Sequence, residues 1–128
     1  MRVLVTGSRT WTDPVPIRGA LGDLAAVHPT ITVVHGGATG ADAIAAQWVA
    51  DRRREGCTGI QEERHPADWK RHGRRAGILR NIEMVRRGAD VCLAFIRDNS
   101  RGAMHCARTA AAAGVETWIF RWPAEVTP

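Results

Sequence analysis

The apolar residues of this chain fall into five short runs that alternate with stretches of helical periodicity. These runs are predicted strands, at residues 2–7, 30–37, 59–65, 90–97 and 115–121. Short continuous apolar runs, in contrast to alternating ones, are typical of strands that are covered on both faces. Strands separated by helices favour parallel order with right-handed crossovers. The sequence therefore predicts an α/β fold in which a mainly parallel sheet of about five strands lies between two helical layers.

The stretches between the runs predict four helices, at residues 14–27, 40–54, 74–87 and 102–113. In the third helix, Ile78, Leu79, Ile82 and Val85 form an apolar stripe that we expect to face the sheet. Gly88 follows as its C-cap. The length of 128 residues suits one domain over residues 1–128.

Cysteine usage and hydropathy indicate the compartment. The chain has 3 cysteines, an odd number, without a CxxC pair, which argues against a disulfide framework or a zinc site and fits a reducing cytosol. The histidines lack metal-ligand spacing. No apolar stretch approaches the roughly 20 residues that span a bilayer. We expect a cytoplasmic protein with no metal and no membrane partner.

The positive charge is concentrated in one segment. The formal net charge is +5, and the segment Arg64–Arg87 contains eight Lys and Arg residues against two acids. A local positive field indicates an anionic ligand, either nucleotide phosphates or a nucleic-acid backbone. The alternative is a solvated face with no ligand.

In a parallel sheet, ligands bind outside the carboxyl ends of the strands, so the loops after the strands are the candidate sites. The loop "GGATGAD" (36–42) joins the second strand to a helix. Glycine lets the backbone approach a ligand, and the helix N-terminus attracts anions. Thr39 and Asp42 match a capping box in its acidic form. Phosphate binding and a simple tight turn both remain open for Gly36, Gly37 and Gly40.

The other three loops add polar and aromatic groups. Gly7, Ser8 and Arg9 end the first strand, where Ser8 can donate a hydrogen bond and Arg9 can pair with a phosphate. Trp11 is either a face for a base or a core residue. The loops after the third and fourth strands contribute five further candidates for ribose, base and phosphate contacts, namely Asp68, Trp69, Ser100, Arg101 and Gly102.

Two residues of the third helix are also candidates. At about 100° per residue, Asn81 lies to the side of the apolar stripe and Arg80 almost opposite its centre. Geometry therefore favours Asn81 for facing the cleft. Arg80 qualifies only if the helix begins later or bends.

With these motifs in place, the chain resembles the SLOG superfamily, which is named for the Smf/DprA and Lonely-guy proteins, and most closely its small YspA-like, cpYpsA-related branch. The resemblance rests on an ordered set of motifs: "GSR" (7–9), "GGATGAD" (36–42), "ADWKRHGRRAG" (67–77), "RNIEM" (80–84) and "SRGAMHCARTA" (100–110). It implies a Rossmann-like, three-layer fold that binds a nucleotide-derived ligand or, in some members, single-stranded DNA.

The chain departs from the Lonely-guy pattern. Those phosphoribohydrolases resemble PGGxGTxxE after the fourth strand, whereas this chain has "IRDNSRGAMHCART", with Cys106 or a neighbour at the place of the catalytic Glu. Asp42 and Asp68 are the remaining weak candidates for a catalytic acid. We therefore expect a binding domain for a nucleotide, such as an ADP-ribose-like or NAD-like molecule, that acts as a sensor, carrier or sink.

Alternative functions are a nucleotide hydrolase that cleaves an N-glycosidic bond and a protein that binds single-stranded nucleic acid through Arg64–Arg87. A homo-oligomer is a further expectation, because Trp118 and Trp122 near the C-terminus can form a sticky patch. The same two residues can equally belong to the core of the subunit.

Overall fold

Five parallel strands form one sheet in the order β3-β2-β1-β4-β5. The structure is a computed structural model that describes residues 1–122. The strands are β1 (Arg2–Gly7), β2 (Ile31–His35), β3 (Ile60–Arg64), β4 (Val91–Arg97) and β5 (Glu116–Trp122). This sheet confirms the prediction of a mainly parallel sheet of about five strands.

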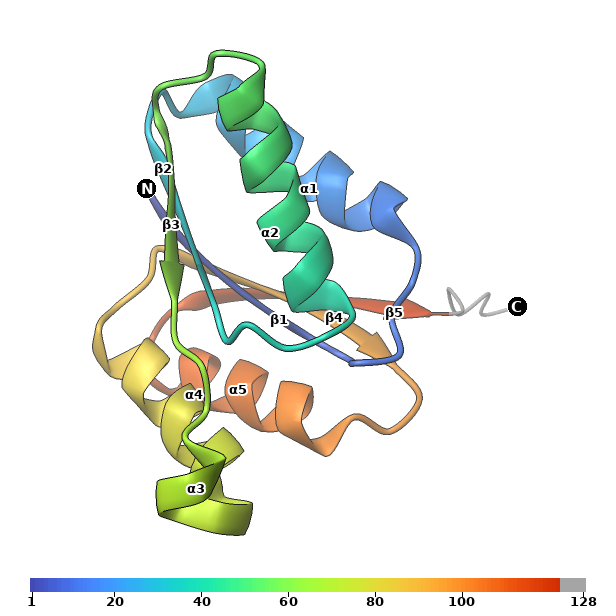
Figure 1. Cartoon of the computed structure of the whole chain (residues 1–128), viewed down its shortest axis with the longest axis vertical. Coiled ribbons are helices and arrows are strands. Elements are labelled where there is room, and N and C mark those ends of the chain that lie inside the picture. The colour runs from blue at the N-terminus through green and yellow to red at the C-terminus, as the bar shows by residue number, and fades with distance from the viewer. Residues whose placement is uncertain (123–128) are drawn as a thin grey trace.

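Helices cover both faces of the sheet (Figure 1). The helices α1 (Pro14–Val27) and α2 (Ala41–Arg54) lie on one face, and α4 (Ala76–Arg86) and α5 (Arg101–Ala112) lie on the other. A short helix α3 (Trp69–His72) and the 3₁₀ turn η1 (Gly73–Arg75) precede α4. This arrangement confirms the three-layer α/β fold. No helix within residues 1–122 combines the length and the apolar character that a bilayer crossing needs.

The central strand β1 supplies side chains to both halves of the core. Val3 and Val5 pack with Ile17 of α1 on one face, and Leu4 packs with Met84 of α4 on the other. Successive side chains of a strand point to opposite faces, so a strand between two helical layers is apolar over most of its buried length. The continuous apolar run "VLV" at residues 3–5 is the pattern expected of a central strand such as β1.

The orientation of α4 corrects one prediction. Ile78 and Ile82 are 48% and 40% exposed, and the buried residues of the helix are Ala76, Asn81, Met84 and Val85. The helix is therefore rotated by roughly a third of a turn from the predicted stripe. The physical reason is that the buried Asn81 finds a hydrogen-bond acceptor in α5, so a polar residue occupies part of the inner face.

The strand order places two loops at a point of reversal. From β1 the chain proceeds outward to β2 and β3, and then returns to the other side of β1 for β4 and β5. The loops after β1 and β4 therefore leave the sheet side by side and diverge in opposite directions. In open α/β sheets such a reversal opens a crevice at the carboxyl ends of the strands.

Candidate functional site

A cavity of about 640 Å³ opens at this reversal. Its walls are the loops after β1 and β4, the first turn of α5, and one side of α4, with Trp69 of α3 at its edge. The volume lies within the range of small-molecule sites. Of the predicted site residues, ten line this cavity: Gly7, Ser8, Arg9, Asp42, Trp69, Arg80, Asn81, Ser100, Arg101 and Gly102.

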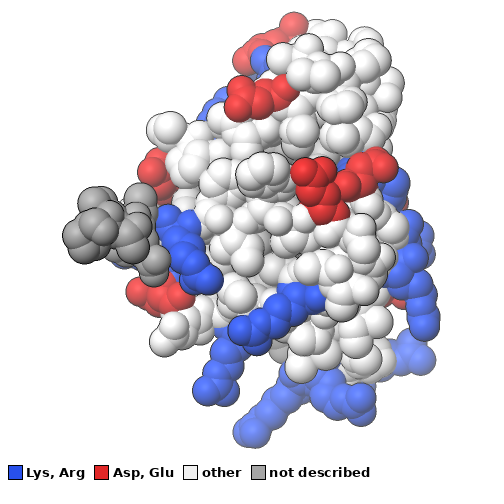
Figure 2. All heavy atoms as spheres, turned by 180° about the vertical axis from the view of Figure 1, so that it is seen from behind, with Lys and Arg blue, Asp and Glu red and all other residues white. Residues whose placement is uncertain are grey.

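The cavity wall is rich in arginine. Five arginines border it, against the two carboxylates of Asp42 and Asp98, and they are Arg9, Arg74, Arg80, Arg97 and Arg101. Figure 2 shows Lys and Arg side chains gathered toward the end of the molecule where Figure 1 places α3, α4 and α5. A concave surface that is lined by one sign of charge attracts and concentrates ligands of the opposite sign.

Ser8 joins the two loops at the floor of the cavity. Its hydroxyl donates to the carbonyl oxygen of Arg97 at 2.9 Å and accepts from the Arg97 backbone N–H at 2.8 Å. Its own N–H donates to the carbonyl oxygen of Phe95. The hydroxyl proton that the sequence offered to a ligand therefore serves the link between the β1 and β4 loops.

Gly40 allows α2 to approach this floor. Its φ is +75°, and a Cβ at this position would collide with the backbone carbonyl of Ser8. The next residue, Ala41, donates its N–H to the same Ser8 carbonyl at 3.3 Å. The positive φ and the close approach of the two backbones are both features that glycine permits.

The carboxylate of Asp42, in the first turn of α2, binds backbone N–H groups of the loop after β2. Its Oδ2 accepts the backbone N–H groups of Gly36 at 3.1 Å and of Ala38 at 3.2 Å. The side chain is 5% exposed, and burial raises the pKa of Asp42, against the opposing effect of these backbone N–H groups. The N–H groups that were predicted to cradle a phosphate thus include two that already hold an anion of the protein itself.

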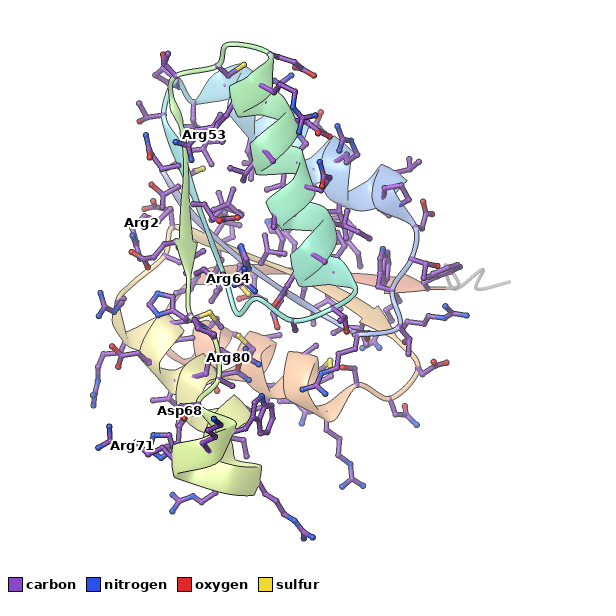
Figure 3. The ribbon with its side chains drawn as sticks, viewed as in Figure 1. Arg2, Arg53, Arg64, Asp68, Arg71 and Arg80 are labelled. Atoms are coloured by element: carbon purple, nitrogen blue, oxygen red, sulfur yellow. The ribbon has the colours of Figure 1, made fainter. Side chains whose placement is uncertain are left out.

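Arg80 and Asn81 connect three elements beside the cavity. Arg80 donates from Nη1 to the carbonyl oxygen of Gly36 at 2.8 Å and from Nε to Asn81 Oδ1 at 3.1 Å. Asn81 donates from Nδ2 to the carbonyl oxygen of Gly102 at 3.1 Å. Figure 3 shows Arg80 reaching from α4 toward the loop between β2 and α2. The helix begins at Ala76 and not at residue 74, and both residues border the cavity.

Trp11 and Trp69 both lie shortly after a strand, but their environments in the structure differ. Trp69 is 49% exposed at the cavity edge, and the Cζ of Arg9 lies 5.6 Å from its ring centroid. Trp11 is 2% exposed and packs edge-to-face against Phe95 and Trp122. Trp69 therefore presents an aromatic face at the cavity, whereas Trp11 is a core residue.

The remaining predicted residues lie outside the cavity wall as described by residues 1–122. They are Gly36, Gly37, Thr39, Gly40 and Asp68. Asp68 is the N-cap of α3, where its Oδ1 accepts the N–H of Arg71 at 3.1 Å. Gly37 lies in a separate hollow beside Arg64.

Sequence reasoning missed Arg74, Arg97 and His105 as wall residues. Arg97 is the last residue of β4, so the rule that sites follow strand ends was a signal that could have found it. Arg74 lies in the basic segment Arg64–Arg87. The sequence does not show that the η1 turn directs Arg74, rather than a neighbouring cation of that segment, to the cavity. His105 follows one turn after Arg101 on α5.

The cysteines are core residues. Cys92 and Cys106 are fully buried, and burial raises the pKa of the Cys92 thiol to about 12 and that of Cys106 to about 11. Thiols with such pKa values are poor nucleophiles at neutral pH. Within residues 1–122, no three His, Cys, Asp or Glu side chains are grouped as metal ligands would be.

Comparison with known proteins gives two matches. Residues 1–72 match the family described as YAcAr, the YspA, cpYpsA-related SLOG family. Over 120 residues, the chain is 53% identical to the "Gene 61 protein" of Mycobacterium phage D29, which covers 93% of this chain and 95% of the phage protein. No solved structure gives a significant match.

Proposed function

Because the chain belongs to the YspA, cpYpsA-related SLOG family, and this membership suggests a nucleotide-related function, we propose that it binds a nucleotide or nucleotide-derived ligand in the cavity between the β1 and β4 loops. A phosphorylated nucleoside, such as an ADP-ribose-like or NAD-like molecule, suits this cavity. The protein then acts as a sensor, carrier or sink for that molecule.

The phosphates are proposed to lie against the first turn of α5. This turn begins at Ser100, whose side chain makes no capping hydrogen bond, so it leaves the helix N-terminus to a ligand. Backbone N–H groups and the helix dipole favour an anion there. Arg101 and Arg97 border the same part of the cavity and can pair with phosphate oxygens. The glycine loop after β2 has a supporting role, because Asp42 already takes two of its N–H groups.

The base is proposed to stack on Trp69. The half-exposed indole lies at the cavity edge with the Arg9 guanidinium above its ring. Stacking on an aromatic face contributes about 1–3 kcal/mol per base. The Trp69 indole at the cavity edge and Arg97 and Arg101 near the first turn of α5 match a ligand that has an aromatic end and an anionic end.

The observation that carries this proposal is the convergence of five arginines on one cavity. Isothermal titration against AMP, ADP, NAD and ADP-ribose tests it, together with mass spectrometry of small molecules that copurify with the protein. Arg101→Gln is expected to weaken binding about tenfold. Arg108→Gln, an exposed position on the same helix, is the matched control. Absence of binding to all four nucleotides, with no copurified nucleotide, would overturn the proposal.

A nucleotide hydrolase is the second candidate function. The observation that favours it is Asp42, a carboxylate on the cavity wall with one oxygen that has no hydrogen-bond partner within residues 1–122. A carboxylate can stabilise the oxocarbenium-like centre that forms when a glycosidic bond breaks. Turnover of AMP and NAD by the wild type, lost in Asp42→Asn, would support this function. Turnover that survives in Asp42→Asn excludes Asp42 as the catalyst.

Single-stranded nucleic acid is the third candidate ligand. Lys70, Arg71, Arg74 and Arg75 are all exposed along α3 and η1. Binding through these cations would weaken steeply with salt, and neutralising all four would abolish it. A fluorescent oligonucleotide titrated at two salt concentrations separates this function from the binding of a mononucleotide in the cavity.

A further inference from the structure

The two oxygens of the Asp42 carboxylate have different environments. Oδ2 accepts two backbone N–H groups, from Gly36 and Ala38. Oδ1 is shielded from water and has no hydrogen-bond partner among the described residues. A buried polar atom without a partner is costly, and the great majority of such atoms in proteins are paired. Asp42 therefore lacks one hydrogen-bond donor.

The surroundings of Asp42 do not supply that donor. The two N–H groups on Oδ2 hold the carboxylate in place, so Oδ1 cannot turn to another donor without losing them. The positive charge of Arg80 acts on Asp42, but its Nη1 and Nε donate to Gly36 and Asn81. The Arg80 guanidinium thus has two of its N–H groups committed to other acceptors.

The position of Asp42 indicates where a donor can come from. Asp42 borders the cavity together with Thr6 and Ala38. Five arginines on the same wall repel an ammonium group and attract an anion. A donor that enters this cavity is therefore a neutral group on a negatively charged molecule. A sugar hydroxyl beside a phosphate has this character.

We propose that Asp42 Oδ1 accepts a hydrogen bond from a ribose hydroxyl of the ligand, so that the cavity selects ribonucleotides over deoxyribonucleotides. The proposal rests on the proposed function, since it assigns a specificity determinant to the same cavity. Because Oδ1 is closed to water in the free protein, the hydroxyl reaches it as wall side chains shift on binding.

The test compares the affinities of the whole chain for ADP, 2′-deoxy-ADP and 3′-deoxy-ADP. Hydrogen bonds to charged groups are among the stronger ones, and loss of one that is made to a buried carboxylate is expected to weaken binding about tenfold or more. Wild type should therefore discriminate against at least one of the two deoxy forms by this factor.

Asp42→Asn tests the residue itself. Its carbonyl oxygen can keep the N–H groups of Gly36 and Ala38, which places the NH₂ group where Oδ1 was. The amide can only donate to the hydroxyl oxygen, and this neutral hydrogen bond is weaker than one made to a carboxylate, so the preference for ADP should fall severalfold. The matched control is Asp13→Asn, which changes a carboxylate that also accepts a backbone N–H, from Val15, but lies outside the cavity wall. It should keep the wild-type preference.

The outcomes separate the two proposals. If wild type binds ADP and both deoxy forms equally, the role of Asp42 is overturned while nucleotide binding stands. If wild type discriminates and Asp42→Asn discriminates equally, another residue reads the hydroxyl and the inference also fails. If the Asn variant is unfolded by circular dichroism, the wild-type comparison alone decides. Failure of wild type to bind any nucleotide overturns the proposed function.

Discussion

Arg80 and Gly36 are 44 positions apart in the sequence, yet the guanidinium of Arg80 donates a hydrogen bond of 2.8 Å to the carbonyl oxygen of Gly36. This contact ties α4 to the loop after β2. Through Nε, the same guanidinium holds Asn81, which in turn bonds the first turn of α5. One side chain therefore positions three parts of the cavity wall.

Arg80→Lys is expected to destabilise the protein by about 1–2 kcal/mol, because an ammonium cannot reproduce the two bonds of the planar guanidinium. Urea denaturation measures the free energy of unfolding. The control is Arg86→Lys, an exposed position on the same helix, which should change stability by less than about 0.5 kcal/mol. Equal losses in the two variants would contradict this role of Arg80.

Gly40→Ala is expected to cost about 3 kcal/mol or more, because the new Cβ combines a positive φ with a collision against the Ser8 carbonyl. Gly114→Ala provides the comparison. Its φ is +86° and a Cβ there meets nothing within 4 Å, so only the backbone strain of about 1–2 kcal/mol applies. The difference between the unfolding free energies of the two variants measures the cost of the collision with Ser8. Equal losses of stability would show that the collision contributes nothing.

Glu63 is expected to make stability depend on pH in the acid range. Hydrogen bonds from Arg2, and then from His65, lower the pKa of Glu63 from 4.5 to about 2. The unfolded chain therefore takes up this proton at higher pH than the folded one. The stabilisation is complete above pH 4.5 and is lost as the pH falls through about 2.

Glu63→Gln removes this titration, so its unfolding free energy should vary less between pH 5 and pH 2 than that of wild type. Glu55→Gln is the control, since the Glu55 side chain is exposed. Urea titrations at several pH values measure the slopes. A wild-type slope in Glu63→Gln would mean that other carboxylates dominate acid unfolding.

Trp69→Phe is expected to remove most of the fluorescence change on nucleotide binding and to weaken affinity by about tenfold, because a phenyl ring offers a smaller stacking face. Trp118→Phe, which alters an exposed indole on β5, should retain both. If quenching persists in Trp69→Phe, the base lies elsewhere in the cavity.

Cys57 is expected to react first with iodoacetamide at pH 8, because it is half-buried whereas Cys92 and Cys106 are fully buried. Burial also raises the pKa values of Cys92 and Cys106 to about 12 and 11, so almost no thiolate forms. Mass spectrometry should show one rapid modification in the native protein and three after denaturation. Rapid labelling at Cys106 would argue against its place in the core.

The strands were predictable because their burial requires a specific pattern. Both faces of β1, β2 and β4 are covered, so each of these strands contains a short continuous apolar run, at residues 3–5, 33–34 and 91–96. The placement of Gly7, Arg9 and the Ser100–Gly102 turn at one rim followed from the parallel order alone. Helix α4 was less predictable, because Asn81 is buried through a bond to Gly102, 21 positions later, which no local periodicity contains.

The role of Asp42 could not be deduced from the glycine loop. Its spacing from Thr39 indicates a helix cap, but which N–H groups a carboxylate accepts depends on its side-chain conformation. In the structure that conformation directs Oδ2 to Gly36 and Ala38. A loop that binds phosphate and a loop whose N–H groups are bound by a carboxylate of the protein can have the same sequence pattern.

The link that Ser8 makes to Arg97 also bears on how a ligand enters and leaves. The Ser8 hydroxyl both donates to and accepts from the Arg97 backbone, so the β1 and β4 loops are fastened to each other at the floor of the cavity. The α3 and η1 segment, by contrast, buries none of its residues, and segments with little buried surface open most readily. We therefore expect the proposed ligand to exchange on the Trp69 side of the cavity, at a rate that depends on how often the α3 and η1 segment opens.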